Sequence, residues 1–141
     1  MPVTREEAPP EALAYVRRGY ELWNSGDLEA VSLTWSEDIE FHTAPEWPGQ
    51  RVYRGRDEVV RFLRAEVADV IELGDIEVEG VAIFGDELVI RLLAHTRGSE
   101  SHLDIGKVPV FHVARMRDGR VDRVRVYLDE GQAVEAATSA G

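Results

Sequence analysis

The fold is decided by residues 108–130, which read VPVFHVARMRDGRVDRVRVYLDE. Two alternating runs flank Asp118-Gly119, a dipeptide that tolerates the positive φ angles of a tight turn, and this pattern predicts a β-hairpin. Direct pairing across the turn predicts an apolar face made of Phe111, Val113, Val124, Val126 and Leu128, with Arg115 and Asp122 near the turn. The other face is mixed and holds Val110, His112, Ala114, Met116, Arg123, Arg125 and Tyr127. The pairing predicts that the first face meets the core and that His112 points away from any pocket.

Composition narrows the class of protein. The 141 residues predict one domain with its own core, and the absence of cysteine excludes disulfides and thiolate chemistry. There are 27 acidic against 16 basic residues, a net charge of -11 that repels nucleic acid and anionic membranes. No run is long and apolar enough to span a bilayer, and no signal-peptide pattern occurs. We therefore expect a cytoplasmic protein without nucleic-acid or membrane partners, and the preference for arginine over lysine is typical of a GC-rich bacterium.

Upstream of the hairpin, the first half of the chain has mainly helical patterns. Leu13, Val16, Tyr20 and Trp23 form one helical stripe that Gly26 ends, and Asp27 can cap a second short helix. Residues 39–43 alternate like a strand, and the Pro/Gly-rich residues 44–55 predict a loop. Asp57 is predicted to cap a third helix, whose stripe is Val59, Val60, Leu63, Val67 and Val70.

The second half of the chain reads as strands. Residues 76–84 and 87–97 predict two strands joined at Gly85-Asp86, and 98–101 a turn before the hairpin. A short helix over 130–137 follows the hairpin. We expect a flexible arm at 1–10, one domain at 11–137 and a tail at 138–141. This order predicts an α+β fold, in which a strongly curved, mixed or antiparallel sheet wraps around three helices and encloses a pocket.

Four motifs resemble the SnoaL-like group of the nuclear transport factor 2-like superfamily, over about residues 11–137. They are Trp23-Asn24-Ser25-Gly26-Asp27-Leu28, Tyr53-Arg54-Gly55-Arg56-Asp57, Arg117-Asp118-Gly119-Arg120-Val121, and Tyr127-Leu128-Asp129 leading into Ala133-Val134-Glu135-Ala136-Ala137. The group includes ketosteroid isomerases, limonene epoxide hydrolases and polyketide cyclases. The resemblance implies a cone-shaped barrel with an apolar pocket and a homodimer built on the outer sheet face. It leaves the reaction open, because this fold carries many activities.

The catalytic residues of these relatives are not reproduced here. The positions that match those of ketosteroid isomerases are Gly19, Thr43 and Phe111. Those that match the epoxide hydrolases are Val126, His95 and Arg97, with Phe41 and Thr43 for the residues that hold water. Valine cannot accept a proton, so neither reaction is expected.

His95, Arg97 and Thr43 are the catalytic candidates. Apolar neighbours predict that His95 points inward, where desolvation and Arg97 would keep the imidazole neutral and able to act as a base. The alternative is a histidine satisfied by one hydrogen bond. Arg97 is a candidate to hold an anionic oxygen, or else pairs with Glu77 or Glu100. Thr43 is a candidate hydrogen-bond donor to a ligand, or else an ordinary strand residue.

The predicted ligand-binding wall is apolar, and its members are Trp35, Phe41, Trp47, Tyr53, Phe62, Phe111 and Val126. Each of them has plain core packing as its alternative. His42, His102, Asp104 and His112 lack the spacing of a metal site, so we expect neither metal nor cofactor. Two hypotheses remain. The protein is a cofactor-free isomerase, cyclase or hydratase that acts on an apolar oxygenated metabolite, or it is a ligand-binding or dimerisation module without turnover.

Overall fold

The computed structural model describes residues 6–7, 10–47, 49–67, 73–97 and 104–139. Its helices are α1 (Pro10–Asn24), α2 (Leu28–Ser32), α3 (Arg56–Phe62) with the π-helical turn Leu63–Val67, and α5 (Glu130–Thr138). Its strands are β1 (Glu6–Glu7), β2 (Trp35–His42), β3 (Val52–Arg54), β4 (Leu73–Phe84), β5 (Glu87–Arg97), β6 (Asp104–Arg117) and β7 (Arg120–Tyr127). The described strands form one seven-stranded sheet in the order β1-β4-β5-β6-β7-β2-β3, antiparallel except where β2 runs parallel to β7.

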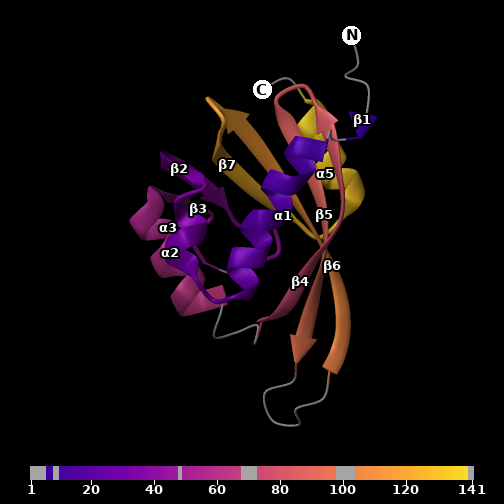
Figure 1. Ribbon diagram of the computed structural model, residues 1–141. Coiled ribbons are helices and arrows are strands. Elements are labelled where there is room, and N and C mark those ends of the chain that lie inside the picture. The colour runs from indigo at the N-terminus through magenta and orange to yellow at the C-terminus, as the bar shows by residue number, and fades with distance from the viewer. Residues whose placement is uncertain (1–5, 8–9, 48, 68–72, 98–103, 140–141) are drawn as a thin grey trace.

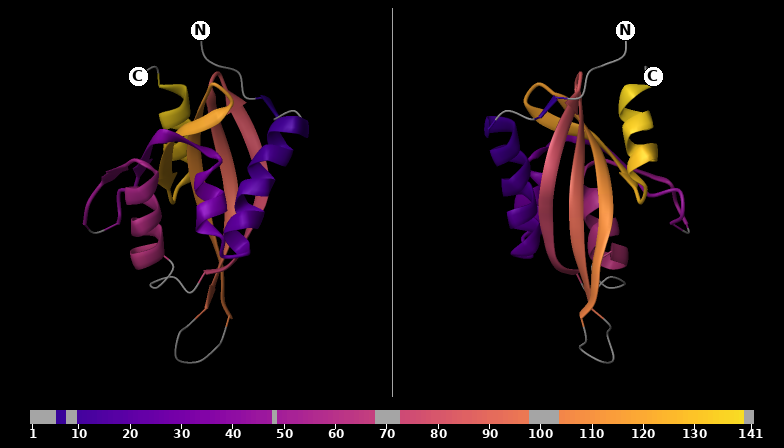
Figure 2. Two further views of the ribbon diagram at one scale, coloured as in Figure 1. Left: turned by 60° about the vertical axis from the view of Figure 1, so that its left-hand side comes forward. Right: turned by 90° about the vertical axis from the view of Figure 1, so that its right-hand side faces the viewer.

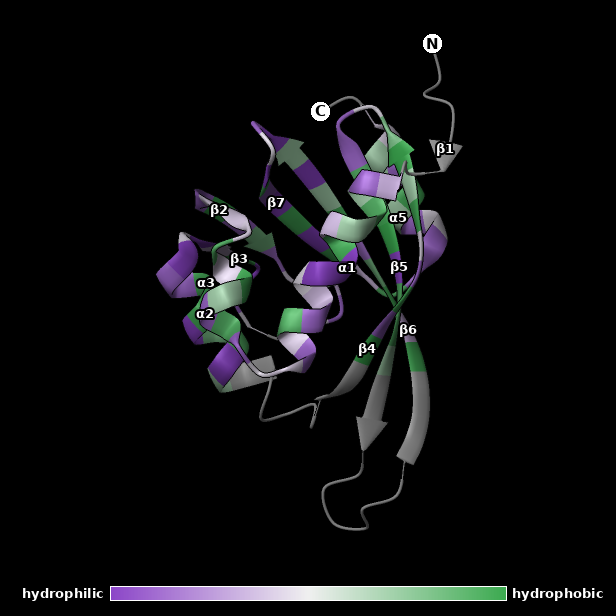
Figure 3. Cartoon of the chain, in the orientation of Figure 1, coloured by the Kyte–Doolittle hydropathy of each residue, from purple (hydrophilic) through white to green (hydrophobic). Residues whose placement is uncertain are grey.

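The sheet curves around three helices, as the sequence predicts. Figure 1 shows β4, β5 and β6 as long strands from which β7, β2 and β3 curl toward α2 and α3. The edge-on view in Figure 2 places α1 on one side of the long strands and α5 on the other. The concave face therefore meets α1, α2 and α3, and the convex face carries α5. In Figure 3, α1 alternates between hydrophilic and hydrophobic residues, as a helix lying on a sheet should.

Several local predictions are confirmed and others are wrong. Asp27 caps α2 by accepting a hydrogen bond from Ala30 N at 3.0 Å, and β4 and β5 pair across the predicted turn. Asp57 does not cap α3, because the helix already begins at Arg56, after Gly55 with φ 87°. The strand predicted over 76–84 begins earlier, because β4 starts at Leu73. The loop predicted over 44–55 contains the short strand β3, and residues 98–101 lie outside the described residues.

The predicted pairing of the β6–β7 hairpin is wrong beyond its first two residue pairs. Arg117 pairs with Arg120 and Met116 with Val121, but Arg115 pairs with Arg123, which leaves Asp122 as the extra residue of a β-bulge. A one-residue shift exchanges the two faces of a strand. His112 and Ala114 therefore share the concave face with Val124 and Val126, whereas Phe111 and Val113 share the convex face with Arg123, Arg125 and Tyr127.

The convex face is covered by an apolar surface of α5. Ala133 is fully buried and Ala137 is 6% exposed, and their small side chains let α5 lie close to Phe84, Val89, Phe111 and Val113. Asp129 caps α5 by accepting a hydrogen bond from Gln132 N at 2.9 Å. At the other end of α5, Arg125 Nη2 donates to the Ala136 carbonyl at 3.2 Å. These contacts hold α5 against the outside of the sheet, away from the concave face.

Asn24, the last residue of α1, fixes the position of this helix over the concave face. Its side-chain Oδ1 accepts from Ile76 N at 2.8 Å, and its Nδ2 donates to the Ile76 carbonyl at 3.1 Å. The amide thus pairs with β4 in the way a neighbouring strand would. This link sets the distance between the sheet and the aromatic residues of α1.

Candidate functional site

A cavity of about 390 Å³ lies between α1, α2, α3 and the concave face. This volume falls within the range of roughly 300–1,000 Å³ found for small-molecule sites. The β5 residues Leu88, Ile90 and Leu92 line one wall, and Val124 and Val126 of β7 line another. The aromatic side chains of the lining come mainly from α1, α3, β2 and the loop after β2; they are Tyr15, Tyr20, Trp23, Trp35, Phe41, Trp47 and Phe62. Such a surface suits a flat, apolar molecule.

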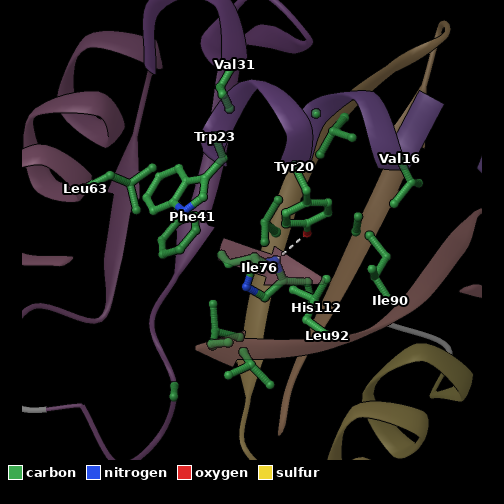
Figure 4. A pocket seen from close by; sticks show the side chains of 18 of the residues that line it. Val16, Tyr20, Trp23, Val31, Phe41, Leu63, Ile76, Ile90, Leu92 and His112 are labelled. Atoms are coloured by element: carbon green, nitrogen blue, oxygen red, sulfur yellow. Dashed lines mark hydrogen bonds between the residues drawn. The ribbon is translucent and has the colours of Figure 1, made fainter. Parts of the chain in front are cut away.

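Two polar side chains meet on this apolar wall. Tyr20 extends from α1 and His112 from β6, and Tyr20 Oη lies 2.6 Å from His112 Nδ1 (Figure 4). Their ring centroids are 5.8 Å apart. Both residues line the cavity, and Figure 4 shows them close to Ile76, Ile90 and Leu92. The pair is therefore reachable by a ligand while being surrounded by hydrocarbon.

Burial keeps both members of the Tyr20–His112 pair uncharged. It lowers the pKa of His112 from 6.5 to about 4, because an imidazolium ion is poorly solvated there. It raises the pKa of the Tyr20 hydroxyl above its ordinary 10.0 for the same reason. At neutral pH the site is thus a phenol hydrogen-bonded to a neutral imidazole.

Besides the indole groups, four other polar residues lie on the lining, and three of them are already engaged. Thr34 Oγ1 donates to the Val31 carbonyl at 2.7 Å. Tyr15 Oη donates to the Thr34 carbonyl at 2.5 Å, and burial is the main cause of its raised pKa. Thr43 Oγ1 lies 3.2 Å from the Gln50 carbonyl, to which it donates. Thr43 therefore closes the loop after β2, and its proton is used within the protein. Glu46, in the same loop, is exposed and is the one carboxylate among the described lining residues.

Most of the predicted wall surrounds the cavity. Trp35, Phe41, Thr43, Trp47, Phe62 and Val126 all line it. Tyr53 instead stacks on Phe62, with ring centroids 4.1 Å apart. Phe111 packs beneath α5 on the convex face, because the bulge at Asp122 reverses its orientation. Contact with a ligand stays a prediction for all of these residues.

The structure leaves the roles of His95 and Arg97 as predictions. Their backbones belong to β5, where His95 pairs with Lys107 and Arg97 with Asp104, but their side chains lie outside the described residues. The described β5 residues that line the cavity are Leu88, Ile90, Leu92 and Ala94.

The sequence analysis missed Tyr20 and His112 as site residues. Tyr20 was assigned to the core stripe of the first helix, and His112 to the wrong face of its strand. One signal in β7 could have revealed the error. Its apolar residues are Val121, Val124 and Val126, and the interval of three between the first two is what a bulge leaves in an alternating pattern.

Within the described ranges, no group of three or more histidine, cysteine, aspartate or glutamate side chains is placed to hold a metal ion. His42 Nε2 lies 3.1 Å from Glu40 Oε1, and burial is the main cause of its lowered pKa. His102 and the side chain of Asp104 fall outside the described residues. None of the described helices is both long and apolar enough to cross a membrane.

The curved sheet, the three helices on its concave face and the enclosed cavity define an α+β pocket protein. Residues 16–124 match the SnoaL-like domain family, so the chain belongs to this family. No curated protein shows significant sequence similarity to the chain.

Solved structures confirm the fold. TerC co-crystallised with polyporic acid has a TM-score of 0.70 at 18% identity, over 90% of this chain and 98% of that one. A Bacillus subtilis protein described as a "putative isomerase" has a TM-score of 0.67 at 19% identity, over 82% and 84% of the two chains. A Sinorhizobium meliloti "putative polyketide cyclase" has a TM-score of 0.63 at 18% identity, over 80% and 93%. At these identities the likeness concerns the fold alone.

Proposed function

We propose that this protein binds an apolar, oxygen-bearing small molecule in the concave cavity, with the Tyr20–His112 pair as the group that recognises the oxygen. The observation that carries the proposal is one hydrogen-bonded polar pair on an otherwise largely apolar, aromatic wall. Specific small-molecule sites combine such a wall with a few placed polar groups. TerC, which shares the fold, was co-crystallised with a small molecule, polyporic acid.

Gly19 allows a direct test of the cavity. It lies on α1 beside Tyr20 and lines the cavity, and a Cβ added there would meet no atom within 4 Å. Gly19→Leu should therefore direct its side chain into the cavity, since its Cβ has room there. The variant should also gain about 1 kcal/mol of stability, because glycine is a poor helix former.

The probe for this test is 1-tetralone, a bicyclic ketone, and binding is measured by isothermal titration calorimetry. We expect wild type to bind 1-tetralone and Gly19→Leu to lose at least about tenfold in affinity, since the leucine occupies the same space. Ala14→Leu is the matched control, because Ala14 is an exposed residue of the same helix. Equal affinities of the three proteins, or no binding to wild type, would contradict the proposal.

Proton transfer is a second candidate function, and Glu46 is the observation that favours it. An isomerase or cyclase needs a base, and Glu46 is the carboxylate among the described lining residues. The carboxylate would take a proton from the carbon next to a ligand carbonyl, and the electron pair would form a carbon–carbon double bond. The negative charge would then develop on the oxygen held at the Tyr20–His112 pair. Return of the proton from the Glu46 carboxyl to another carbon of the conjugated system, or to the opposite face of the same carbon, would complete an isomerisation and restore the carboxylate.

This second function predicts hydrogen exchange without any net reaction. In D₂O, wild type should speed incorporation of deuterium beside the carbonyl of 1-tetralone, as followed by proton NMR. Glu46→Gln should reduce the enzyme-dependent rate by about 10²-fold while binding is kept, as expected for loss of a general base. Glu37→Gln, which alters an exposed carboxylate of β2, is the control. Exchange no faster than in buffer would leave binding as the function.

A further inference from the structure

We infer that the cavity selects an uncharged ligand whose oxygen only accepts a hydrogen bond, such as the carbonyl of a cyclic ketone or a quinone, and that His112 Nε2–H is the donor. This inference rests on the proposed function, since it names the ligand chemistry of the same site. It follows from the direction of the hydrogen bond between Tyr20 and His112, and from the other groups that line the cavity.

The hydrogen bond between Tyr20 and His112 has two possible directions. If His112 donated through Nδ1, the Tyr20 hydroxyl proton would need another acceptor, and Nε2 would be left as an unmet acceptor. No described residue other than His112 bonds Tyr20 Oη. If Tyr20 donates to Nδ1, the hydroxyl proton has its acceptor, and the N–H at Nε2 of His112 is the one donor of the pair that still lacks a partner. Because an unmet buried polar group costs roughly 1–3 kcal/mol, the second direction is favoured.

That direction fixes the tautomer of His112. A neutral imidazole whose Nδ1 accepts a hydrogen bond carries its proton on Nε2. Within the described part of the chain, no side chain or backbone group bonds Nε2. His112 lines the cavity, and Figure 4 shows Ile76, Ile90 and Leu92 near its ring. Nε2 is not one of the fully buried polar atoms, so it is accessible from the cavity, and a ligand oxygen can accept its hydrogen bond in place of water.

The same surroundings disfavour other oxygen groups. A ligand hydroxyl can accept from Nε2–H, but its own proton would then face the aliphatic side chains around the imidazole and lose its partner. A carboxylate would need a positive charge, and no lysine or arginine occurs among the described residues that line the cavity. A neutral carbonyl satisfies Nε2–H and brings no proton or charge of its own. Neutral imidazole as a donor to a carbonyl is also an established way to polarise that group.

The tautomer can be read in the free protein. In a two-bond ¹H–¹⁵N correlation spectrum at neutral pH, Nδ1 of His112 should resonate as an unprotonated ring nitrogen and Nε2 as a protonated one. Tyr20→Phe removes the donor to Nδ1 and should shift the Nδ1 resonance. The reverse tautomer in wild type would overturn the inference, and this measurement requires no ligand and no stable His112 variant.

Three probes with one carbon skeleton test the ligand class. They are 1-tetralone with a carbonyl, 1-tetralol with a hydroxyl and tetralin with no oxygen. Calorimetry should give a preference of about tenfold for 1-tetralone over 1-tetralol in wild type, as expected for one unmet hydrogen bond. In His112→Phe the preference should fall to about one, with tetralin binding retained. Leu88→Phe changes another residue of the lining and should keep the preference.

The outcomes separate the two proposals. Equal binding of 1-tetralone and 1-tetralol to wild type, or a preference that persists in His112→Phe, would overturn the carbonyl inference while the proposed binding function stands. Failure of all three probes to bind would contradict the proposed function. The tautomer would then still decide which hydrogen-bonding group the protein offers to its cavity.

Discussion

Replacement of Asp122 by alanine is expected to lower the free energy of unfolding by about 2–3 kcal/mol, because it removes two charge-assisted hydrogen bonds and leaves the partly buried Arg115 guanidinium without its partner. The Asp122 side chain is 8% exposed. Its Oδ1 accepts from Arg115 Nε at 2.8 Å and its Oδ2 from Arg115 Nη2 at 3.1 Å, while Arg117 Nε lies 3.4 Å away. The Arg115 side chain is itself 24% exposed, so water cannot fully replace the lost carboxylate.

Urea titration followed by tryptophan fluorescence measures this effect. Asp38→Ala is the matched control, because Asp38 is an exposed carboxylate of the neighbouring strand β2, and it should change stability by less than about 0.5 kcal/mol. The double variant Arg115→Ala/Asp122→Ala should recover part of the loss, since it removes the stranded guanidinium as well. A loss for Asp122→Ala no larger than that of the control would show that this bidentate pair does not stabilise the hairpin.

Acidification from pH 6.5 to pH 4 should destabilise wild type by about 3 kcal/mol more than it destabilises His112→Phe. The pKa of His112 is about 4 in the folded protein against an ordinary value of 6.5. As the pH falls, the unfolded chain binds its proton first, and this favours unfolding. The penalty is absent above pH 6.5, grows as the pH falls toward 4 and is complete below it.

Urea titrations at several pH values between 4 and 8 test this difference, and only the slope of stability against pH is compared. Tyr20→Phe is the control, because it keeps the buried imidazole and should retain most of the wild-type slope. His42 also has a lowered pKa, but it titrates equally in wild type and in His112→Phe and so cancels from the difference. Parallel curves for wild type and His112→Phe would show that the imidazole is well solvated in the folded state.

Helical periodicity and turn residues predicted most of the fold. The apolar stripe from Leu13 to Trp23 predicted α1, and Gly85-Asp86 predicted the turn between β4 and β5. Both signals depend only on residues that are near one another in the sequence. The register of β6 against β7 was not found in this way. Alternation assigns Asp122 to an ordinary polar position of the strand. In the structure its carboxylate forms salt bridges with Arg115 and Arg117 on the convex face. Packing of that ion pair is a tertiary interaction that alternation alone cannot show.

The candidate site could also be predicted only in part, because some of its features depend on local pattern and others on tertiary interactions. Composition and local pattern predicted several of the aromatic residues around the cavity, but two of those predicted lie elsewhere, since Tyr53 stacks on Phe62 and Phe111 packs under α5. The polar pair depends on two residues that are 92 positions apart in the chain and on the face exchange caused by one inserted residue. Homodimerisation through the outer sheet face stays a prediction. Part of that face lies under α5, and Arg123 and Arg125 there contact Glu87.

The position of α5 has a consequence for folding during translation. Phe84, Val89, Phe111 and Val113 are shielded by a helix that is made after every strand of the sheet. While the ribosome still holds residues 130–138, the outer side of the long strands stays bare and open to chaperones or to other nascent chains. Docking of those nine residues is therefore the step that removes this apolar surface from contact with other chains.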